Sequence, residues 1–360
     1  MTSAAAPSGT FQVTVQPSGR SFSVQEGEAI LHAAIRQGVG LPYGCKDGAC
    51  GSCKSKKLDG QVVHGPHQSK ALSQEEEAAG FVLTCSALPQ TDIVLESRQV
   101  TDESAFPIKK MPSRVLSLEK KSSDVMLLRL QLPANDTMRY HAGQYVEFIL
   151  RDNARRSYSM ANAPHTLARP DATPPVGPAI ELHIRHMPGG KFTDHVFNAM
   201  KEKEILRVEG PYGSFFLRED SAKPMVLLAS GTGFAPIKAV IEHMQHKGIT
   251  RPATLYWGGR RPSDLYLDDW VQGKLAEMPN LKYVPVISNA LPEDNWTGRT
   301  GFVHRAVLED FPDLSGYQVY ACGAPIVVDS ARAEYSAQAG LPPEEFYADS
   351  FTTEADKHRD

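Results

Sequence analysis

The chain has 360 residues, enough for two or three domains, and its 41% hydrophobic and 22% charged residues are typical of a soluble globular protein. Its 38 basic and 42 acidic side chains give a net charge of −4 without a long basic run, which argues against a nucleic-acid partner. The longest apolar runs, such as residues 225–229, are far shorter than the roughly 20 residues of a membrane-spanning helix, so no membrane partner is expected.

Residues 10–98 are predicted to form a first domain. Apolar and polar residues alternate over residues 11–15 and 22–24 on either side of a Pro-Ser-Gly turn, which predicts a β-hairpin. Residues 28–37 place their apolar side chains on one helical face, and Gly38 is positioned to end that helix. Ser73 and Glu76 have the spacing of a capping box and predict a second, short helix.

Three cysteines lie between these helices in C-x4-C-x2-C spacing, and a fourth follows after a gap; they are Cys45, Cys50, Cys53 and Cys85. This is the ligand spacing of a plant-type 2Fe-2S cluster. An iron-sulfur core with thiolate ligands carries excess negative charge, so its loop must turn backbone N–H groups inward. Gly44, Gly48, Ala49, Gly51 and Ser52 are small enough to allow this.

Two other readings of the cysteines are weaker. A structural zinc site usually has two C-x2-C pairs, and only one is present. Disulfides are disfavoured because residues 1–10 have no signal-peptide features, and the reducing cytoplasm is the expected location. His64 and His67 flank Gly65-Pro66 and are expected in a solvated loop, not at a second metal site.

Residues 99–112 have little periodicity and are interpreted as a linker, and residues 113–221 as a second domain. Short alternating segments predict strands of an antiparallel barrel. These strands are expected over residues 114–119, 125–132, 145–150, 180–186 and 205–209. Residues 167–178, rich in proline and alanine, are expected to form a surface loop.

Two motifs in the barrel suit a phosphorylated planar ligand. Arg156 and Tyr158 lie two residues apart on a predicted strand and so share a face, where one can bind a phosphate and the other can stack on a ring. Further on, Gly190 opens a helix predicted to reach about residue 203, and Thr193 is placed to cap it. Such a helix start is an anion site. A surface arginine and an ordinary barrel tyrosine remain the alternative for the first motif.

Residues 222–352 alternate strand and helix signals and predict a doubly wound parallel sheet, followed by a tail over residues 353–360. Strands are expected over residues 225–229, 253–257, 283–287, 317–321 and 346–347, and helices over residues 267–278, 303–310 and 325–339. The turn that begins at Gly231 leads into a further helix, with Pro236 in its first position.

Two strand-to-helix turns in this domain are candidate nucleotide-binding segments. One contains Gly231, Thr232 and Gly233, and the other contains Cys322 and Gly323. In a doubly wound sheet, turns at the carboxyl ends of the strands line a ligand crevice. The alternatives are a simple tight turn and a small buried thiol.

Domain order and motifs resemble the reductase components of bacterial multicomponent oxygenases from Phe11 to Phe351. In these proteins a β-grasp ferredoxin domain precedes the FAD-binding six-stranded β-barrel and the NAD(P)-binding domain of the ferredoxin-NADP reductase superfamily. The resemblance implies a 2Fe-2S cluster, FAD and a nicotinamide nucleotide as cofactors, and an NAD(P)H-dependent oxidoreductase.

The resemblance also assigns roles to residues. Arg156 would bind a FAD phosphate, Tyr158 would stack on the isoalloxazine, and Ser159 would hydrogen-bond near the reactive flavin nitrogen. Ser159, Cys322 and Phe351 form the expected catalytic set, although nine residues follow Phe351 here, whereas some relatives end on the aromatic residue. The other expected cofactor-binding residues are His183, Arg185, Gly190, Lys191, Thr193, Gly231, Thr232, Gly233, Arg260 and Gly323. Relatives usually have serine where Thr193 stands.

The nucleotide is expected to be NADH, as in most related oxygenase reductases. Arg260 and Arg261 stand where an acidic residue would favour NAD, so NADPH stays open. The flavin divides the electron pair of the hydride for a cluster that accepts one electron at a time. The expected partner is a terminal oxygenase that docks near the cluster. The alternatives are a deoxysugar dehydratase, as for CDP-6-deoxyglucoseen reductases, and a non-catalytic redox-sensing module.

Overall fold

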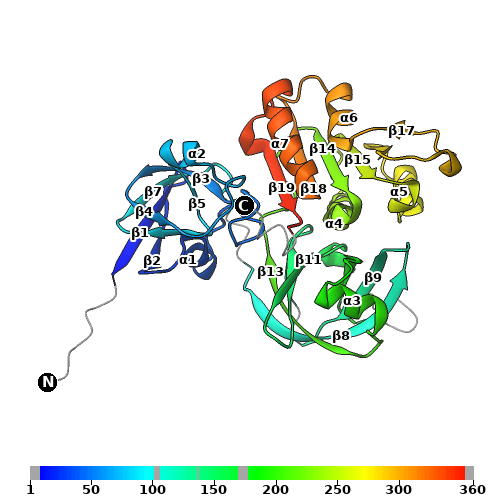
Figure 1. The fold of residues 1–360 in the computed structure, drawn as a ribbon, viewed down its shortest axis with the longest axis horizontal. Coiled ribbons are helices and arrows are strands. Elements are labelled where there is room, and N and C mark those ends of the chain that lie inside the picture. Colours follow the sequence, from blue (N-terminus) through cyan, green and yellow to red (C-terminus); the bar gives the residue numbers. More distant parts are fainter. Residues whose placement is uncertain (1–8, 101–105, 136–137, 169–176, 353–360) are drawn as a thin grey trace. The chain divides into compact units, whose positions relative to one another are not determined.

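The computed structural model describes residues 9–100, 106–135, 138–168 and 177–352. The chain divides into two compact units, one built on the described residues up to Phe106 and the other spanning Pro107–Phe351 (Figure 1). Most of the loop predicted over residues 167–178 lies outside the described residues. Within the described residues, no helix is both long and apolar enough to cross a bilayer.

The first unit is built on a mixed five-stranded sheet of order β2-β1-β7-β3-β5. The β1–β7 pair is parallel and the other pairs are antiparallel, which is the arrangement of a β-grasp fold. Its elements are β1 (Thr10–Gln16), β2 (Arg20–Gln25), α1 (Ile30–Arg36), β3 (Lys54–Asp59), β4 (Val62–His64), α2 (Gln74–Ala78), β5 (Phe81–Leu83), β6 (Ala87–Pro89) and β7 (Ile93–Glu96).

Local sequence signals account for both helices of this unit. Ile30, Leu31 and Ala34 of α1 are fully buried, and Gly38 follows the helix with a φ of +71° that favours glycine. The predicted capping box of α2 is confirmed, because Ser73 and Glu76 exchange side-chain and backbone hydrogen bonds.

The second unit begins with six antiparallel strands in the order β11-β10-β13-β8-β9-β12, as predicted for the barrel. An antiparallel bridge between Met160 and Leu182 joins the two ends of this order. The elements are β8 (Lys109–Lys120), β9 (Val125–Gln131), β10 (Tyr145–Ile149), β11 (Arg155–Ser159), η1 (Pro164–Thr166), β12 (Ala179–Arg185), α3 (Lys191–Asn198) and β13 (Ile205–Tyr212).

Two predictions about α3 are wrong. The helix ends at Asn198, not near residue 203, because the chain turns there to bury Met200 in the barrel core. Thr193 does not cap it. The N-cap is Gly190, and the Thr193 hydroxyl donates instead to the carbonyl of Met187 at 2.9 Å, which ties down the preceding turn.

The rest of the second unit is a six-stranded, fully parallel sheet of order β17-β16-β15-β14-β18-β19. The elements are β14 (Met225–Ser230), η2 (Gly231–Gly233), α4 (Phe234–Lys247), β15 (Ala253–Gly259), η3 (Pro262–Asp264), α5 (Asp268–Glu277), β16 (Leu281–Ile287), η4 (Pro292–Asp294), β17 (Arg299–Thr300), α6 (Val303–Asp310), β18 (Gln318–Gly323), α7 (Pro325–Ala339), η5 (Pro343–Glu345) and β19 (Phe346–Ser350).

Alternate residues of β14 explain why both faces of this sheet are covered. Leu227 and Ala229 pack in one apolar cluster with α4 and α5, whereas Val226 and Leu228 pack in another with α6 and α7 (Figure 1). This confirms the doubly wound arrangement. Pro236 is the third residue of α4 and not the first, because Gly231–Gly233 form a 3-10 turn before it. The short β17 was not predicted.

Candidate functional site

The four predicted cluster cysteines lie as two pairs. The backbone N–H of Cys45 donates to the sulfur of Cys50 at 3.4 Å, and the sulfurs of Cys53 and Cys85 are 3.3 Å apart. Three of them are buried and Cys45 is half-buried. A 2Fe-2S cluster takes two thiolates on each of its two irons, so two cysteine pairs suit this group.

The loop that holds these cysteines depends on its glycines. Gly48 and Gly51 have φ values of +78° and +72°, where glycine is favoured. A methyl group on Gly48 would lie 2.8 Å from the carbonyl oxygen of Pro66 and 2.9 Å from the Cα of His67. The cluster loop therefore packs directly against the segment that carries the two histidines.

That packing corrects the prediction of a solvated histidine loop. The Nε2 of His67 lies 2.9 Å from a carboxylate oxygen of Glu77 on α2, and its Nδ1 lies 2.8 Å from the carbonyl oxygen of Gly65. Only 15% of the His67 side chain is exposed. These contacts hold the histidine segment in place against the cluster loop.

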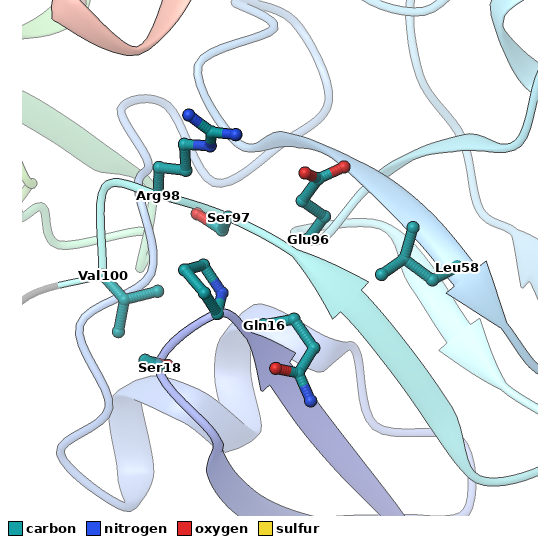
Figure 2. Close-up of a pocket in the computed structure, with 8 residues that line it drawn as sticks. Gln16, Ser18, Leu58, Glu96, Ser97, Arg98 and Val100 are labelled. Carbon is teal, nitrogen blue, oxygen red and sulfur yellow. The ribbon is translucent and has the colours of Figure 1, made fainter.

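A pocket of about 490 Å³ in the first unit lies away from these cysteines. Figure 2 shows Gln16, Leu58 and Glu96 around it, at the ends of β1, β3 and β7. Leu58 is at the far end of β3 from Cys53, and none of the four cysteines lines the pocket. We assign no cofactor to it.

The predicted flavin motif lies on β11. Arg156 and Tyr158 are paired across the strands with Phe148 and Val146, which belong to the barrel core, so both side chains share one face as expected. The Tyr158 ring contacts Phe148 and also Phe192 of α3, with ring centroids 5.8 and 5.4 Å apart. These contacts fix the aromatic ring close to the start of α3.

The start of α3 brings together the predicted pyrophosphate residues. Gly190 is its N-cap, and a methyl group there would lie 2.7 Å from the Thr193 hydroxyl and 2.8 Å from the Met187 carbonyl. The Lys191 ammonium is exposed and lies 2.6 Å from Asp152. Backbone N–H groups and an exposed cation at a helix start are suited to a phosphate.

The two glycine turns of the nucleotide domain meet where the strand order reverses, between β14 and β18. A methyl group on Gly233 would lie 2.6 Å from the Cα of Gly323, and the amide of Ala324 donates to the Ser230 hydroxyl at 2.8 Å. Only glycine permits this close approach. Thr232 lies buried between these glycines.

The predicted catalytic residues lie at the same place. Ser159 of the barrel donates to the carboxylate of Asp349 at 2.9 Å, and Asp349 pairs with Cys322 across β18 and β19. The amide of Phe351 donates to the carbonyl of Gly323 at 2.8 Å. Burial raises the pKa of the Cys322 thiol, and the nearby Asp349 carboxylate raises it further. The thiol therefore stays protonated at neutral pH.

Two predicted ligand residues on β12 have different surroundings. His183 is fully buried, and its ring nitrogens lie 2.8 Å from the Tyr266 hydroxyl and 3.2 Å from Glu181, so protein groups occupy both. The Arg185 guanidinium lies against the glycine turn, 3.1 Å from where a methyl group on Gly231 would be. Its contacts with Asp124 and Asp264 are long, at 3.5 and 3.8 Å.

Arg260 and Arg261, which left open whether the nucleotide is NADH or NADPH, have different surroundings. Arg261 makes a two-pronged ion pair with Asp294, with both N–O distances at 2.7 Å. The pKa of the Asp294 carboxyl is lowered mainly by its hydrogen bonds from the Arg261 guanidinium, and further by the backbone amide of Leu291. Arg260 is exposed, and its backbone amide donates to Asp264 at 2.7 Å.

Sequence reasoning missed two residues of this region. Asp349 stands two residues before Phe351, and a carboxylate that follows three apolar or aromatic residues in the final strand was a signal that it had a partner. Phe302, 60% exposed, directly precedes α6. Because a methyl group on Gly258 would lie 2.7 Å from the Cβ of Val303, this helix start packs against the carboxyl end of β15. An exposed aromatic residue carries no pattern that would have revealed it.

Three families of domains match consecutive parts of the chain. Residues 13–90 match the 2Fe-2S iron-sulfur cluster binding domain, residues 112–217 the oxidoreductase FAD-binding domain, and residues 227–333 the oxidoreductase NAD-binding domain.

Relatives match nearly the whole chain. The CDP-6-deoxy-L-threo-D-glycero-4-hexulose-3-dehydrase reductase of Yersinia pseudotuberculosis is 39% identical over 95% of this chain and 98% of its own length. Reductase component 2 of terephthalate 1,2-dioxygenase from Comamonas sp. is 35% identical over 95% and 97%. The crystal structure of the Amycolatopsis cytochrome P450 reductase GcoB has a TM-score of 0.75 at 31% identity, covering 95% of this chain and 99% of the other.

Proposed function

The chain belongs to the iron-sulfur flavoprotein reductases, which join a 2Fe-2S domain to FAD-binding and NAD-binding oxidoreductase domains, and we propose that it delivers electrons from NADH singly to a terminal oxygenase. The cofactors supply the redox chemistry: the nicotinamide gives a hydride, FAD divides the electron pair, and the cluster releases electrons one at a time. The observation that carries the proposal is the meeting of Ser159, Asp349 and Cys322 at the reversal of strand order.

The chain's own residues then bind and orient these groups. Arg156, Gly190, Lys191 and Thr193 would hold the FAD phosphates, and Tyr158 would pack against its ring. The turns at Gly231 and Gly323 would receive the nicotinamide nucleotide, with Arg185 close enough to meet its phosphates. Ser159 offers a hydroxyl whose orientation is set by Asp349.

NADH is favoured over NADPH by the state of Arg261. Both prongs of its guanidinium are already used by Asp294, so it offers less to a 2′-phosphate than a free arginine would. Phe302 presents an aromatic face at the same edge of the sheet, on which a planar base can stack. Arg260 is exposed directly after β15, and the Arg305 guanidinium lies 5.7 Å from the centre of the Phe302 ring.

The partner is proposed to dock near the cluster loop, at whose surface Asp47 is exposed. A terminal oxygenase is the main candidate, as for the Comamonas relative. A sugar dehydrase is the second candidate, because the Yersinia relative, at 39% identity, is named for one. Purification of the partner with this chain as bait, followed by NADH-dependent turnover of the pair, separates the two.

The reductase reading is tested with the Cys50→Ser variant. We expect NADH still to reduce the flavin, as in the wild type, but one-electron reduction of cytochrome c to be lost, since Cys50 belongs to the cluster set and lies in the other unit from the flavin residues. Arg156→Ala is the opposite control, expected to weaken FAD retention. Loss of flavin reduction in Cys50→Ser with FAD fully bound would contradict the modular electron path.

A further inference from the structure

A buried cluster of charged groups joins the FAD-binding barrel to the nucleotide-binding domain. The Lys238 ammonium on α4 lies 2.7 Å from Glu242 of the same helix, 3.1 Å from Glu181 on β12, and 3.0 Å from the carbonyl oxygen of Ala161. An ammonium has three N–H donors, so these three acceptors satisfy it completely. Only 8% of the Lys238 side chain is exposed.

The cluster has further contacts across the same boundary. The second carboxylate oxygen of Glu242 accepts from the amide of Ala163 in the barrel at 2.8 Å. Glu181 also accepts from the Nε2–H of His183, whose Nδ1 then accepts from the hydroxyl of Tyr266 in the nucleotide domain. Beside the charges, three buried alanines, Ala142, Ala163 and Ala239, pack together and let the domains approach closely.

The segment of η2 and α4 and the strand β12 also border the proposed nucleotide turn. Gly231 and Lys238 are seven residues apart on the continuous segment of η2 and α4, and Arg185 and Glu181 are four apart on β12. Gly231 and Arg185 touch at the nucleotide turn, and Lys238 and Glu181 meet at the cluster. The contact at the nucleotide turn and the contact at the cluster are therefore on the order of 10 Å apart, both along η2 and α4 and along β12. A shift at the cluster is therefore carried to the site.

We propose that Lys238 is a positioning residue for hydride transfer. It fixes β12 against α4, and so sets how closely the turn at Gly231 approaches β11, the barrel strand that carries Tyr158 and Ser159. This rests on the proposed reduction of FAD by NADH. Misplacing reacting atoms by about 1 Å costs on the order of 100-fold in rate. Ion pairing suits this purpose better than apolar packing, because its acceptors define one position for the cation.

The titratable groups around the cluster determine the test. Glu181 and His183 come from β12, and Glu242 comes from α4. His165 of η1 interacts with Glu242, Tyr140 from the segment before β10 interacts with both glutamates, and His243 and His246 of α4 lie beside His165. Burial acts to raise the pKa of Glu181, but the His183 hydrogen bond and the Lys238 charge outweigh it and lower the pKa to about 2. Without Lys238, two buried carboxylates would face each other with no cation, and one would take up a proton.

Lys238→Met is compared with Lys274→Met in the full-length holoprotein. Lys274 is a matched control, because it also lies near the Trp270 ring and pairs with a glutamate, Glu277, but its partners all lie in the nucleotide domain. Stopped-flow flavin reduction over a range of NADH concentrations gives the limiting rate and the NADH dissociation constant separately. Melting temperatures of both variants are measured from about pH 5 to pH 8.

We expect Lys238→Met to lose about 10- to 100-fold in limiting rate with less than about a threefold change in NADH affinity. Its rate and melting temperature should fall as pH rises from about 5 to 8, since a raised carboxyl pKa stabilises only while that group is protonated. Adding Glu242→Gln should remove this pH dependence. Lys274→Met should behave as wild type.

An unchanged limiting rate and a flat pH profile in Lys238→Met would overturn the proposal, as would an equal loss in Lys274→Met. If Lys238→Met does not fold with FAD bound, Glu242→Gln alone serves: a reduced limiting rate with unchanged NADH affinity supports the proposal, and a wild-type rate overturns it. A wild-type protein whose flavin NADH does not reduce would instead refute the proposed function.

Discussion

Replacing Gly233 by alanine tests whether the two nucleotide turns must touch. The nearest atom to the added methyl group would be the carbonyl oxygen of Cys322, and the methyl would lie 2.5 Å from that carbonyl carbon and 2.6 Å from the Cα of Gly323. Ordinary contact begins at 3.4 Å, so clearing the carbonyl carbon alone requires the turn to open by about 0.9 Å, and clearing the nearer oxygen requires more. All three atoms are backbone, and none can rotate away.

The expected cost is about 1 to 3 kcal/mol, the usual range for an overpacked site. For a unit of this size that corresponds to a fall in melting temperature of roughly 2 to 12 °C. Because the opening lies at the proposed nicotinamide site, flavin reduction by NADH should fall by on the order of 100-fold. Thermal unfolding of the holoprotein and stopped-flow reduction measure the two effects.

Gly273 provides the matched control. It lies inside α5 of the same domain, and a methyl group there meets nothing within 4 Å. Gly273→Ala should raise stability by about 0.5 to 1 kcal/mol and leave flavin reduction unchanged. The reasoning is refuted if Gly233→Ala melts and reacts like the wild type, or if both glycine variants lose the same amount.

The remaining predictions concern the other sites. Arg156→Ala should weaken FAD binding by about 1.5 to 3 kcal/mol, the value of a hydrogen bond to a charged group; fluorescence titration of the apoprotein with FAD would show no change if Arg156 has no such role. Gly48→Ala should lower iron content per chain, since the loop cannot keep its contact with Pro66 and His67; iron analysis with full occupancy counts against this. In the wild type, the Glu181 carboxylate stabilises the fold above about pH 4.5, because its pKa is lowered to about 2. This stabilisation should be lost as the pH falls from about 4.5 to 2. Glu181→Gln should flatten that part of the stability curve, and an identical acid transition in both proteins argues against this role of Glu181.

Periodic and spaced features were predictable from the sequence, and long-range contacts were not. The C-x4-C-x2-C spacing, the capping box at Ser73 and Glu76, and the alternation of strands and helices each depend on neighbouring residues, and all appear in the fold. The predicted end of α3, near residue 203, was wrong because burial of Met200 in the barrel overrides local helix preference. The bond between Ser159 and Asp349 joins residues 190 positions apart, which no local pattern encodes.

The position of the histidines shows the same limit. His64 and His67 beside Gly65-Pro66 have the composition of an exposed loop, yet Glu77 on α2 lies 2.9 Å from His67. Lys238 is a further case, because an isolated lysine on a helix predicts a solvated side chain, whereas here two glutamates and a carbonyl enclose it. Buried charges become visible only when their partners are brought together by the fold.

The most direct test of the central claim is an anaerobic titration of the purified protein with NADH, followed by visible absorption and electron paramagnetic resonance, with iron and acid-labile sulfide measured on the same sample. The account predicts two irons and two sulfides per chain, flavin bleaching, and the signal of a reduced 2Fe-2S cluster once NADH is in excess over the protein. A protein that contains zinc in place of iron, or a cluster that stays oxidised while NADH reduces the flavin, would contradict it.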